Sequence, residues 1–192
     1  LVGAVSVPLY YTSPPTEIDL ILQASGARLL LVGAPKIMAR LTELHSQVPV
    51  ISFCRQPQPS TPDRSVMLWD EFLALGAGQE EIVTSPAGLG DPATLRYTSG
   101  TTGHPKGVIF HHAHLRWMGE CIASLMPWQA RQRPAAWLSC LPMSHVVEGI
   151  LATYAPYYVP ASVSITFLED LRQLPLALRQ VRPSIFFSVP RI

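Results

Sequence analysis

The sequence contains few charged residues. Asp, Glu, Lys and Arg make up 14% of its 192 residues, against roughly 25% in ordinary globular domains. A free-standing domain with so few charges would have a thinly solvated surface, whereas 48% of the residues are hydrophobic and can form a sizeable core. We therefore expect that neighbouring parts of a longer chain cover some faces of this one.

Positive charge is neither abundant nor clustered. The formal net charge is +1, without a block of Lys and Arg, which excludes nucleic acid as a partner because a phosphate-binding face needs clustered cations. Three cysteines, an odd number without C-x-x-C spacing, indicate small buried residues in a reducing compartment. We expect a cytoplasmic location and leave peripheral membrane contact open.

A transmembrane span is also lacking, and neither end has the polar composition that is typical of a chain terminus. Residues 149–168 carry no charge, but Pro156 and Pro160 indicate a helix, a turn and a strand rather than a span. The sequence begins without Met inside an apolar run and stops directly after another. Such ends need neighbouring structure, so we expect a piece of a longer protein.

Short β-rich runs alternate with helical patterns, which predicts an α/β protein with layered, mostly parallel sheets flanked by helices. The predicted strands are 4–10, 28–33, 48–54, 93–99, 107–110, 136–140, 161–167 and 184–189. The predicted helices are 14–25, 35–46, 66–76, 112–126, 145–155 and 175–181. Ser13 is the expected N-cap of the first helix, with Pro14 at its first position. Residues 1–53 form a βαβαβ unit, 54–90 a loop-rich connector and 91–192 a further subregion.

The stretch Tyr97–Val108, "YTSGTTGHPKGV", follows an apolar strand and contains three glycines, four Ser/Thr hydroxyls and one lysine. Glycines let a ligand approach backbone amides closely, and successive amides in such a turn form an anion site. Lys106 adds a full positive charge, so the stretch fits a polyphosphate. The ordinary P-loop pattern is not met, because no Ser or Thr follows the lysine and the loop joins strand to strand.

This stretch closely resembles the phosphate-binding signature of the adenylate-forming superfamily, which includes acyl-CoA synthetases, luciferases and peptide-synthetase adenylation domains. "LPMSHVVEG" and "VRPSIFFSVPRI" resemble the next two core motifs, and "GAVSVPLYYTSPPTEIDLILQASGARLLLV" an early α/β unit. The resemblance covers nearly the whole chain and is greatest to the long-chain fatty acyl branch. It implies an incomplete N-terminal adenylation domain without the C-terminal domain.

The resemblance implies that a carboxylic acid, in the long-chain branch a fatty acid, is activated with ATP and Mg²⁺ and passed to the thiol of coenzyme A or of a carrier protein. The implied phosphate-binding residues are Thr98, Ser99, Gly100, Thr101, Thr102, Gly103 and Lys106. Thr98 is the implied Mg²⁺ contributor, Lys106 and His145 are the implied catalytic residues, and His145 lies beside the acid or acyl pocket. From the residues alone, a capping or core role is favoured for His145, because histidines are often partly buried.

Several positions depart from the family pattern. Arg96 interrupts an otherwise apolar strand, His114 stands where Asn is frequent, Pro160 where Gly is frequent, and Gly149 where the long-chain branch often has Arg. The cluster His111, His112 and His114 lacks a completing ligand set, so loop and capping roles are favoured over a metal.

Three functions remain open at this point. The parent is a fatty acid–CoA ligase, or it activates another acid as an acyl-AMP ligase or an aryl or amino-acid adenylating enzyme, or the chain is a non-catalytic fragment or pseudoenzyme. Because the family's later motifs do not occur in these 192 residues, we expect the isolated chain to be inactive.

Overall fold

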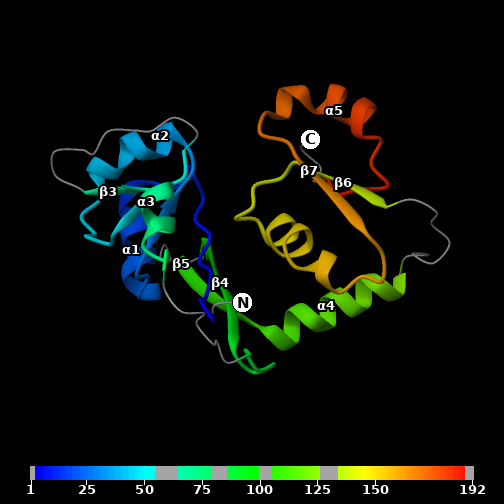
Figure 1. Ribbon diagram of the computed structural model, residues 1–192, viewed down its shortest axis with the longest axis horizontal. Coiled ribbons are helices and arrows are strands. Elements are labelled where there is room, and N and C mark those ends of the chain that lie inside the picture. Colours follow the sequence, from blue (N-terminus) through cyan, green and yellow to red (C-terminus); the bar gives the residue numbers. More distant parts are fainter. Residues whose placement is uncertain (1–2, 55–64, 79–85, 100–104, 126–133, 189–192) are drawn as a thin grey trace. The chain divides into compact units, whose positions relative to one another are not determined.

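The computed structural model describes residues 3–54, 65–78, 86–99, 105–125 and 134–188. The chain forms two compact units (Figure 1). Unit 1 comprises Leu1–Pro86 and Tyr97–Val108, and unit 2 comprises Ala87–Arg96 and Ile109–Ile192.

Unit 1 contains a parallel sheet of three strands in the order β1-β2-β3. The strands are β1 (Leu30–Val32), β2 (Val50–Ser52) and β3 (Val66–Leu68), with Leu30 opposite Val50 and Val50 opposite Val66. The helices are α1 (Pro15–Ser25), α2 (Pro35–Met38), the 3₁₀-helix η1 (Ala39–Glu43) and α3 (Trp69–Ala74). The predicted parallel pairing of the strands at 28–33 and 48–54 is confirmed.

The core of unit 1 is an aliphatic cluster between the sheet and its helices. One face of α1 contributes Ile18 and Leu22, as the helical spacing predicts. The other buried members of the cluster are Leu30, Val32, Met38, Leu41, Leu44, Val50 and Val66. Gly26 ends α1 with φ 62°, a left-handed conformation that costs glycine little, so the predicted end of this helix is confirmed.

The predicted start of α1 is wrong by one residue. Pro14, not Ser13, is the N-cap, and Pro15 takes the first helical position. A residue that precedes a proline is disfavoured in the α region, and Pro14 is accordingly extended, with φ −60° and ψ 150°. Ser13 is buried, and its carbonyl accepts a hydrogen bond from Arg40 Nη2 at 2.6 Å.

Two further predictions in unit 1 are wrong. Residues 66–68 belong to β3 rather than to a helix, because they pair with β2 and tertiary pairing outweighs the local helical pattern. Residues 4–10 form no strand; an isolated bridge occurs at Ser6. Pro8 lacks the N–H that a continuing ladder would need.

Strands β4 (Pro92–Ser99) and β5 (Pro105–His111) pair with each other. The boundary between the two units passes through both strands, between Arg96 and Tyr97 in β4 and between Val108 and Ile109 in β5. The predicted phosphate loop therefore connects two paired strands, as the sequence predicts.

Unit 2 contains a second parallel sheet of three strands, in the order β7-β6-β8. The strands are β6 (Ala135–Ser139), β7 (Val163–Phe167) and β8 (Ile185–Phe186). The helices are α4 (His112–Leu125), the π-helix η3 (Val147–Ala152), the 3₁₀-helices η4 (Ala155–Tyr157) and η5 (Leu171–Gln173), and α5 (Leu174–Val181). No helix within the described residues combines the length and the apolar character that crossing a bilayer requires.

The predicted α-helix at 145–155 is instead a π-helix followed by a 3₁₀ turn. Near its end, the N–H of Thr153 donates to the carbonyl of Ile150. The carbonyl of Gly149, which an α-helix would offer to Thr153, accepts a hydrogen bond from the side chain of Arg96. A tertiary contact thus takes over a backbone acceptor, and π-turns of this kind are frequent at functional sites.

Candidate functional site

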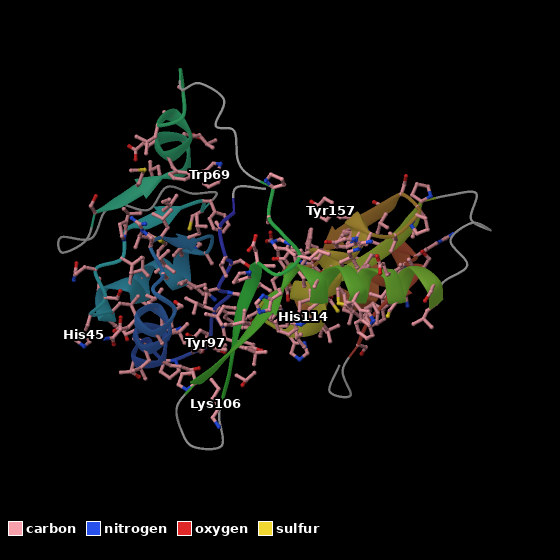
Figure 2. The ribbon with its side chains drawn as sticks, turned by 90° about the horizontal axis from the view of Figure 1, so that it is seen from below. His45, Trp69, Tyr97, Lys106, His114 and Tyr157 are labelled. Atoms are coloured by element: carbon pink, nitrogen blue, oxygen red, sulfur yellow. The ribbon has the colours of Figure 1, made fainter. Side chains whose placement is uncertain are left out.

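The residues flanking the predicted phosphate loop lie on the parts of β4 and β5 that belong to unit 1. Thr98 is near the end of β4 and Lys106 is the second residue of β5, and both are exposed. Figure 2 labels Lys106 on β5 and Tyr97, the neighbour of Thr98, on β4. The Ser99 side chain and the residues Gly100, Thr101, Thr102 and Gly103 lie outside the described part of the structure.

In unit 2, the side chain of Arg96 binds a turn far along the chain. Arg96 is 6% exposed. Its Nη1 donates to the carbonyls of Met143, Ser144 and His145, at 3.3, 3.1 and 3.5 Å. Its Nη2 donates to the carbonyl of Gly149 at 2.7 Å. One guanidinium thus binds both ends of the segment from Met143 to Gly149, which contains His145.

His145 lies between β6 and η3, at the strand-to-helix junction that the sequence predicts. Its N–H donates to Pro142 O at 2.8 Å, and its own carbonyl accepts from the N–H of Gly149 at 2.9 Å. The N–H of Val147 donates to Nδ1 of the His145 ring at 3.3 Å. Because a backbone N–H can only donate, this contact selects, for the neutral ring, the tautomer that carries its proton on Nε2.

Glu148 is a buried carboxylate in the same segment, with none of its surface exposed. Its Oε1 accepts from the backbone N–H of Cys140 at 2.9 Å and of Leu141 at 3.4 Å. Within the described residues, Oε2 has no hydrogen-bond partner. Burial raises the pKa of the neighbouring Cys140 thiol, and the charge of the Glu148 carboxylate raises it further.

Gly149 permits the close approach of Arg96. A Cβ at position 149 would stand 2.5 and 2.6 Å from Nη1 and Nη2 of Arg96, and still closer to the backbone oxygen of Met143. A larger residue would therefore have to displace the turn itself. Arg96 and Gly149 both depart from the family pattern, and the Arg96 guanidinium lies where a side chain at position 149 would be.

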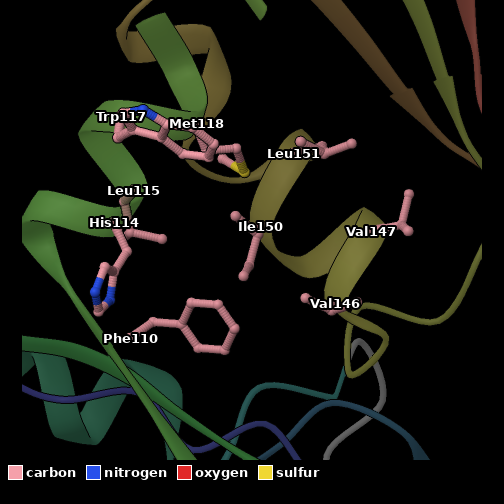
Figure 3. A pocket seen from close by; sticks show the side chains of 9 residues that line it. All are labelled: Phe110, His114, Leu115, Trp117, Met118, Val146, Val147, Ile150 and Leu151. Carbon is pink, nitrogen blue, oxygen red and sulfur yellow. The ribbon is translucent and has the colours of Figure 1, made fainter. Parts of the chain in front are cut away.

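An apolar pocket of about 410 Å³ lies beside this turn within unit 2. Figure 3 shows side chains of α4 facing those of Val146 and η3 across it, with Phe110 nearby. The lining residues are Phe110, His114, Leu115, Trp117, Met118, Val146, Val147, Ile150 and Leu151. Apart from His114 the lining side chains are apolar, so the pocket suits a hydrocarbon group.

The histidine cluster at the start of α4 makes local contacts. His111 Nδ1 lies 2.6 Å from Gly90 O, to which it must donate, and His114 Nδ1 accepts the N–H of His111 at 3.1 Å. The backbone N–H of His112 donates to Asp91 O at 3.0 Å. Among the described residues, no three or more His, Cys, Asp or Glu side chains are arranged to hold a metal ion.

Two polar residues of the site received no role from the sequence. Arg96 stands out as a single charge in an apolar strand, and Glu148 as a single acid in the apolar run 146–152. An isolated charge in an apolar pattern is a usable signal, because such groups are rarely buried without partners. Their partners, however, cannot be read from local sequence.

Comparison with known proteins defines the class of this chain. The AMP-binding enzyme family matches residues 1–192, and the chain belongs to this family. It is 30% identical to the long-chain-fatty-acid–CoA ligase ACSBG2 of Gallus gallus, covering 99% of this chain and 26% of that protein. It is 31% identical to the long-chain-fatty-acid–CoA ligase FadD15 of Mycobacterium bovis, covering 100% of this chain and 31% of that protein.

Structural comparison agrees on the fold. The anthranilate CoA ligase AuaEII, solved in complex with anthranoyl-AMP, has a TM-score of 0.73 and 20% identity; the match covers 97% of this chain and 35% of that one. The predicted α/β fold class and the predicted resemblance are therefore confirmed. This chain spans less than a third of the length of the two curated relatives described above.

Proposed function

We propose that the protein containing this chain is an ATP-dependent fatty acid–CoA ligase. A carboxylate oxygen of the acid attacks the α-phosphorus of ATP, and the bond to pyrophosphate breaks. The thiol of coenzyme A then attacks the acyl carbon, loses its proton, and releases AMP. The proposal is carried by one observation: identity of 30–31% along almost the whole chain to two long-chain-fatty-acid–CoA ligases.

The predicted phosphate loop is proposed to hold the β- and γ-phosphates of ATP. Lys106 and the loop amides from Ser99 to Gly103 would offset the negative charge that grows on pyrophosphate as it leaves. Lys106 is exposed on β5, as an ATP ligand must be before binding.

Thr98 fits a Mg²⁺ ligand, because its exposed position offers a hydroxyl oxygen, the donor type that this ion prefers. Bound Mg²⁺ would supply charge neutralisation on the phosphates. The role of this chain is then to present the Thr98 oxygen next to the loop that holds them.

The acid is proposed to bind in unit 2. Nε2 of His145 carries the proton of the neutral ring and can donate to a carboxylate, while the apolar pocket beside the turn receives the hydrocarbon. Each methylene that leaves water for such a pocket contributes about 0.8 kcal/mol. Affinity should therefore rise with chain length until the pocket is full.

We further propose that the chain is part of an N-terminal adenylation domain, in which residues 91–192 form the phosphate-loop and acyl-site subregion. A cytoplasmic location with peripheral membrane contact fits the free cysteines and a lipid substrate. An aryl acid is the second candidate substrate, since the fold is also that of an anthranilate CoA ligase.

Acid-dependent ATP–pyrophosphate exchange by the full-length parent tests this function. Palmitate, benzoate and a mixture of amino acids would be compared, and coenzyme A then added to detect the thioester. Exchange with palmitate should fall about 100-fold in Lys106→Ala. Lys36→Ala is the matched control, because Lys36 is the only other lysine of the sequence and is exposed on α2. Exchange with benzoate alone would show that the substrate is an aryl acid rather than a fatty acid. Absence of exchange with any of the acids would refute the proposed ligase function.

A further inference from the structure

Arg96 is a buried cation whose guanidinium binds backbone carbonyls. A buried guanidinium needs acceptors for its donors, because taking the charge out of water is costly. The carbonyls from Met143 to His145 and that of Gly149 supply them. These carbonyls converge on one group only while the turn keeps its present shape.

We propose that Arg96 is the positioning residue for His145. This inference rests on the proposed function, since it concerns how the acid-binding histidine is held. Arg96 itself need not touch the substrate: it binds the main chain on both sides of His145 and sets where that residue stands relative to β4.

The hydrogen bonds of His145 explain how the constraint reaches its ring. Its carbonyl receives both the Gly149 N–H at 2.9 Å and Arg96 Nη1 at 3.5 Å. The ring is fixed separately, by the Val147 N–H on Nδ1 at 3.3 Å. If the turn moves, Val147 and the ring lose their alignment, and Nε2 no longer carries the proton in every molecule.

The planar shape of arginine is essential to this role. Its five donors form a rigid fork, whereas the lysine ammonium is a compact point charge on a flexible stem. Arg96 Nη1 and Nη2 reach carbonyls at opposite ends of the segment, Ser144 at 3.1 Å and Gly149 at 2.7 Å. A lysine at position 96 cannot span both. Arg96→Lys therefore keeps the charge but loses the shape.

A double-mutant cycle in the full-length parent distinguishes positioning from general stabilisation. The cycle compares wild type, Arg96→Met, His145→Ala and the double variant by palmitate-dependent exchange. Arg96→Met should lower kcat/KM for palmitate about 100-fold in the wild-type background, the loss typical of a misplaced group. In the His145→Ala background, Arg96→Met should lower kcat/KM for palmitate by less than about threefold, because the effects of coupled residues are not additive. The KM for ATP should change by less than about twofold in both backgrounds, since Arg96 acts on the acid site.

Equal losses in both backgrounds would overturn the proposal, because Arg96 would then act independently of His145. If Arg96→Met does not fold, Arg96→Lys takes its place in the cycle, with the same criterion. Arg116→Met is the matched control: Arg116 is exposed on α4, pairs with Glu120 at 2.7 Å, and should leave exchange unchanged. Absence of exchange in the wild type would refute the proposed function rather than the role of Arg96.

A spectroscopic measurement keeps the inference testable without activity. Ring ¹⁵N shifts of His145 in the parent should show protonated Nε2 and unprotonated Nδ1 at a pH where the ring is neutral. In Arg96→Lys the shifts should move towards a mixture of the two tautomers, while Arg116→Met should leave them unchanged. Identical His145 shifts in wild type and Arg96→Lys would overturn the positioning role.

Discussion

The two units bury different kinds of side chain. The core of unit 1 is an aliphatic cluster, and the buried polar residues described there are Ser13 and Ser52. Unit 2 has apolar clusters as well, but also buries Arg96 and Glu148, which carry opposite charges. Both charges bind the backbone of one segment, Cys140–Gly149.

This difference indicates that the aliphatic core of unit 1 serves stability, whereas the buried charged residues of unit 2 fix the position of a backbone segment. Aliphatic contacts, which are non-directional, stabilise unit 1. Volume-conserving substitutions in such a core are well tolerated. Buried charges are weak stabilisers, because desolvation offsets their interactions. Their use in unit 2 is explained if the position of the Cys140–Gly149 turn matters for binding the acid.

The largest expected effect comes from removing the buried carboxylate of unit 2. Glu148→Ala leaves the N–H groups of Cys140 and Leu141 without an acceptor. Such a loss costs about 3 kcal/mol in the free energy of unfolding, measured by urea titration of the parent. Glu148→Gln keeps an oxygen acceptor and should cost less than half as much. Equal losses in the two variants would show that the acceptor is unimportant.

Gly149→Ala should cost about 2 kcal/mol, because the new Cβ displaces the Met143 carbonyl and Arg96. Gly90→Ala is the matched control in the same unit, since no atom lies within 4 Å of a Cβ built there. Thermal melting of both variants checks the prediction, and palmitate-dependent exchange should fall only in Gly149→Ala. If Gly149→Ala melted at the same temperature as wild type, the close packing of Gly149 against Met143 and Arg96 would be contradicted.

A core truncation in unit 1 should weaken stability without touching the turn. Ile51 in β2 is 2% exposed, and Ile51→Val removes one methylene from a buried site. The free energy of unfolding should fall by about 1 kcal/mol. At a temperature where the variant is folded, its kcat/KM for palmitate should equal that of wild type. A lower kcat/KM in Ile51→Val would contradict the view that the core of unit 1 serves stability alone.

The smallest expected effect is a change in pH dependence from Cys140. Its thiol pKa is raised above the ordinary value of 9.0, first by burial and then by Glu148. Its contribution to stability is therefore fully present below that ordinary value and is lost as the pH rises through the raised pKa. Urea titrations should show stability falling more steeply above pH 9 in wild type than in Cys140→Ala. Parallel curves would contradict the raised pKa.

Local sequence predicted the regular parts of the fold. Apolar runs and helical spacing located the parallel strands β1, β2, β6, β7 and β8, the helices α1 and α4, and the strand-to-strand connection at the predicted phosphate loop. Two wrong predictions have different causes. Two successive prolines shift the start of α1 locally, whereas residues 66–68 form a strand because they pair with β2. At 147–152 the competing cause is a contact with Arg96.

The site was predictable only where one motif contains it. Lys106 was predicted from the glycine-rich stretch and Thr98 from the family resemblance of that stretch; both lie on strands that flank the loop, and their roles stay predictions. The role of Arg96 could not follow from sequence, because its acceptors lie 47 to 53 residues further along the chain. Arg96 binds backbone carbonyls, which every residue type has, so the sequence does not indicate which residues accept its hydrogen bonds.

Isotope transfer tests the central claim most directly. The full-length parent would be incubated with palmitate labelled with ¹⁸O in both carboxylate oxygens, ATP and coenzyme A, and the products analysed by mass spectrometry. If the acid is activated as an acyl-adenylate, one labelled oxygen leaves with AMP and one stays in palmitoyl-CoA. Unlabelled AMP, or ADP and labelled phosphate in its place, would contradict adenylate formation and with it this account of the chain.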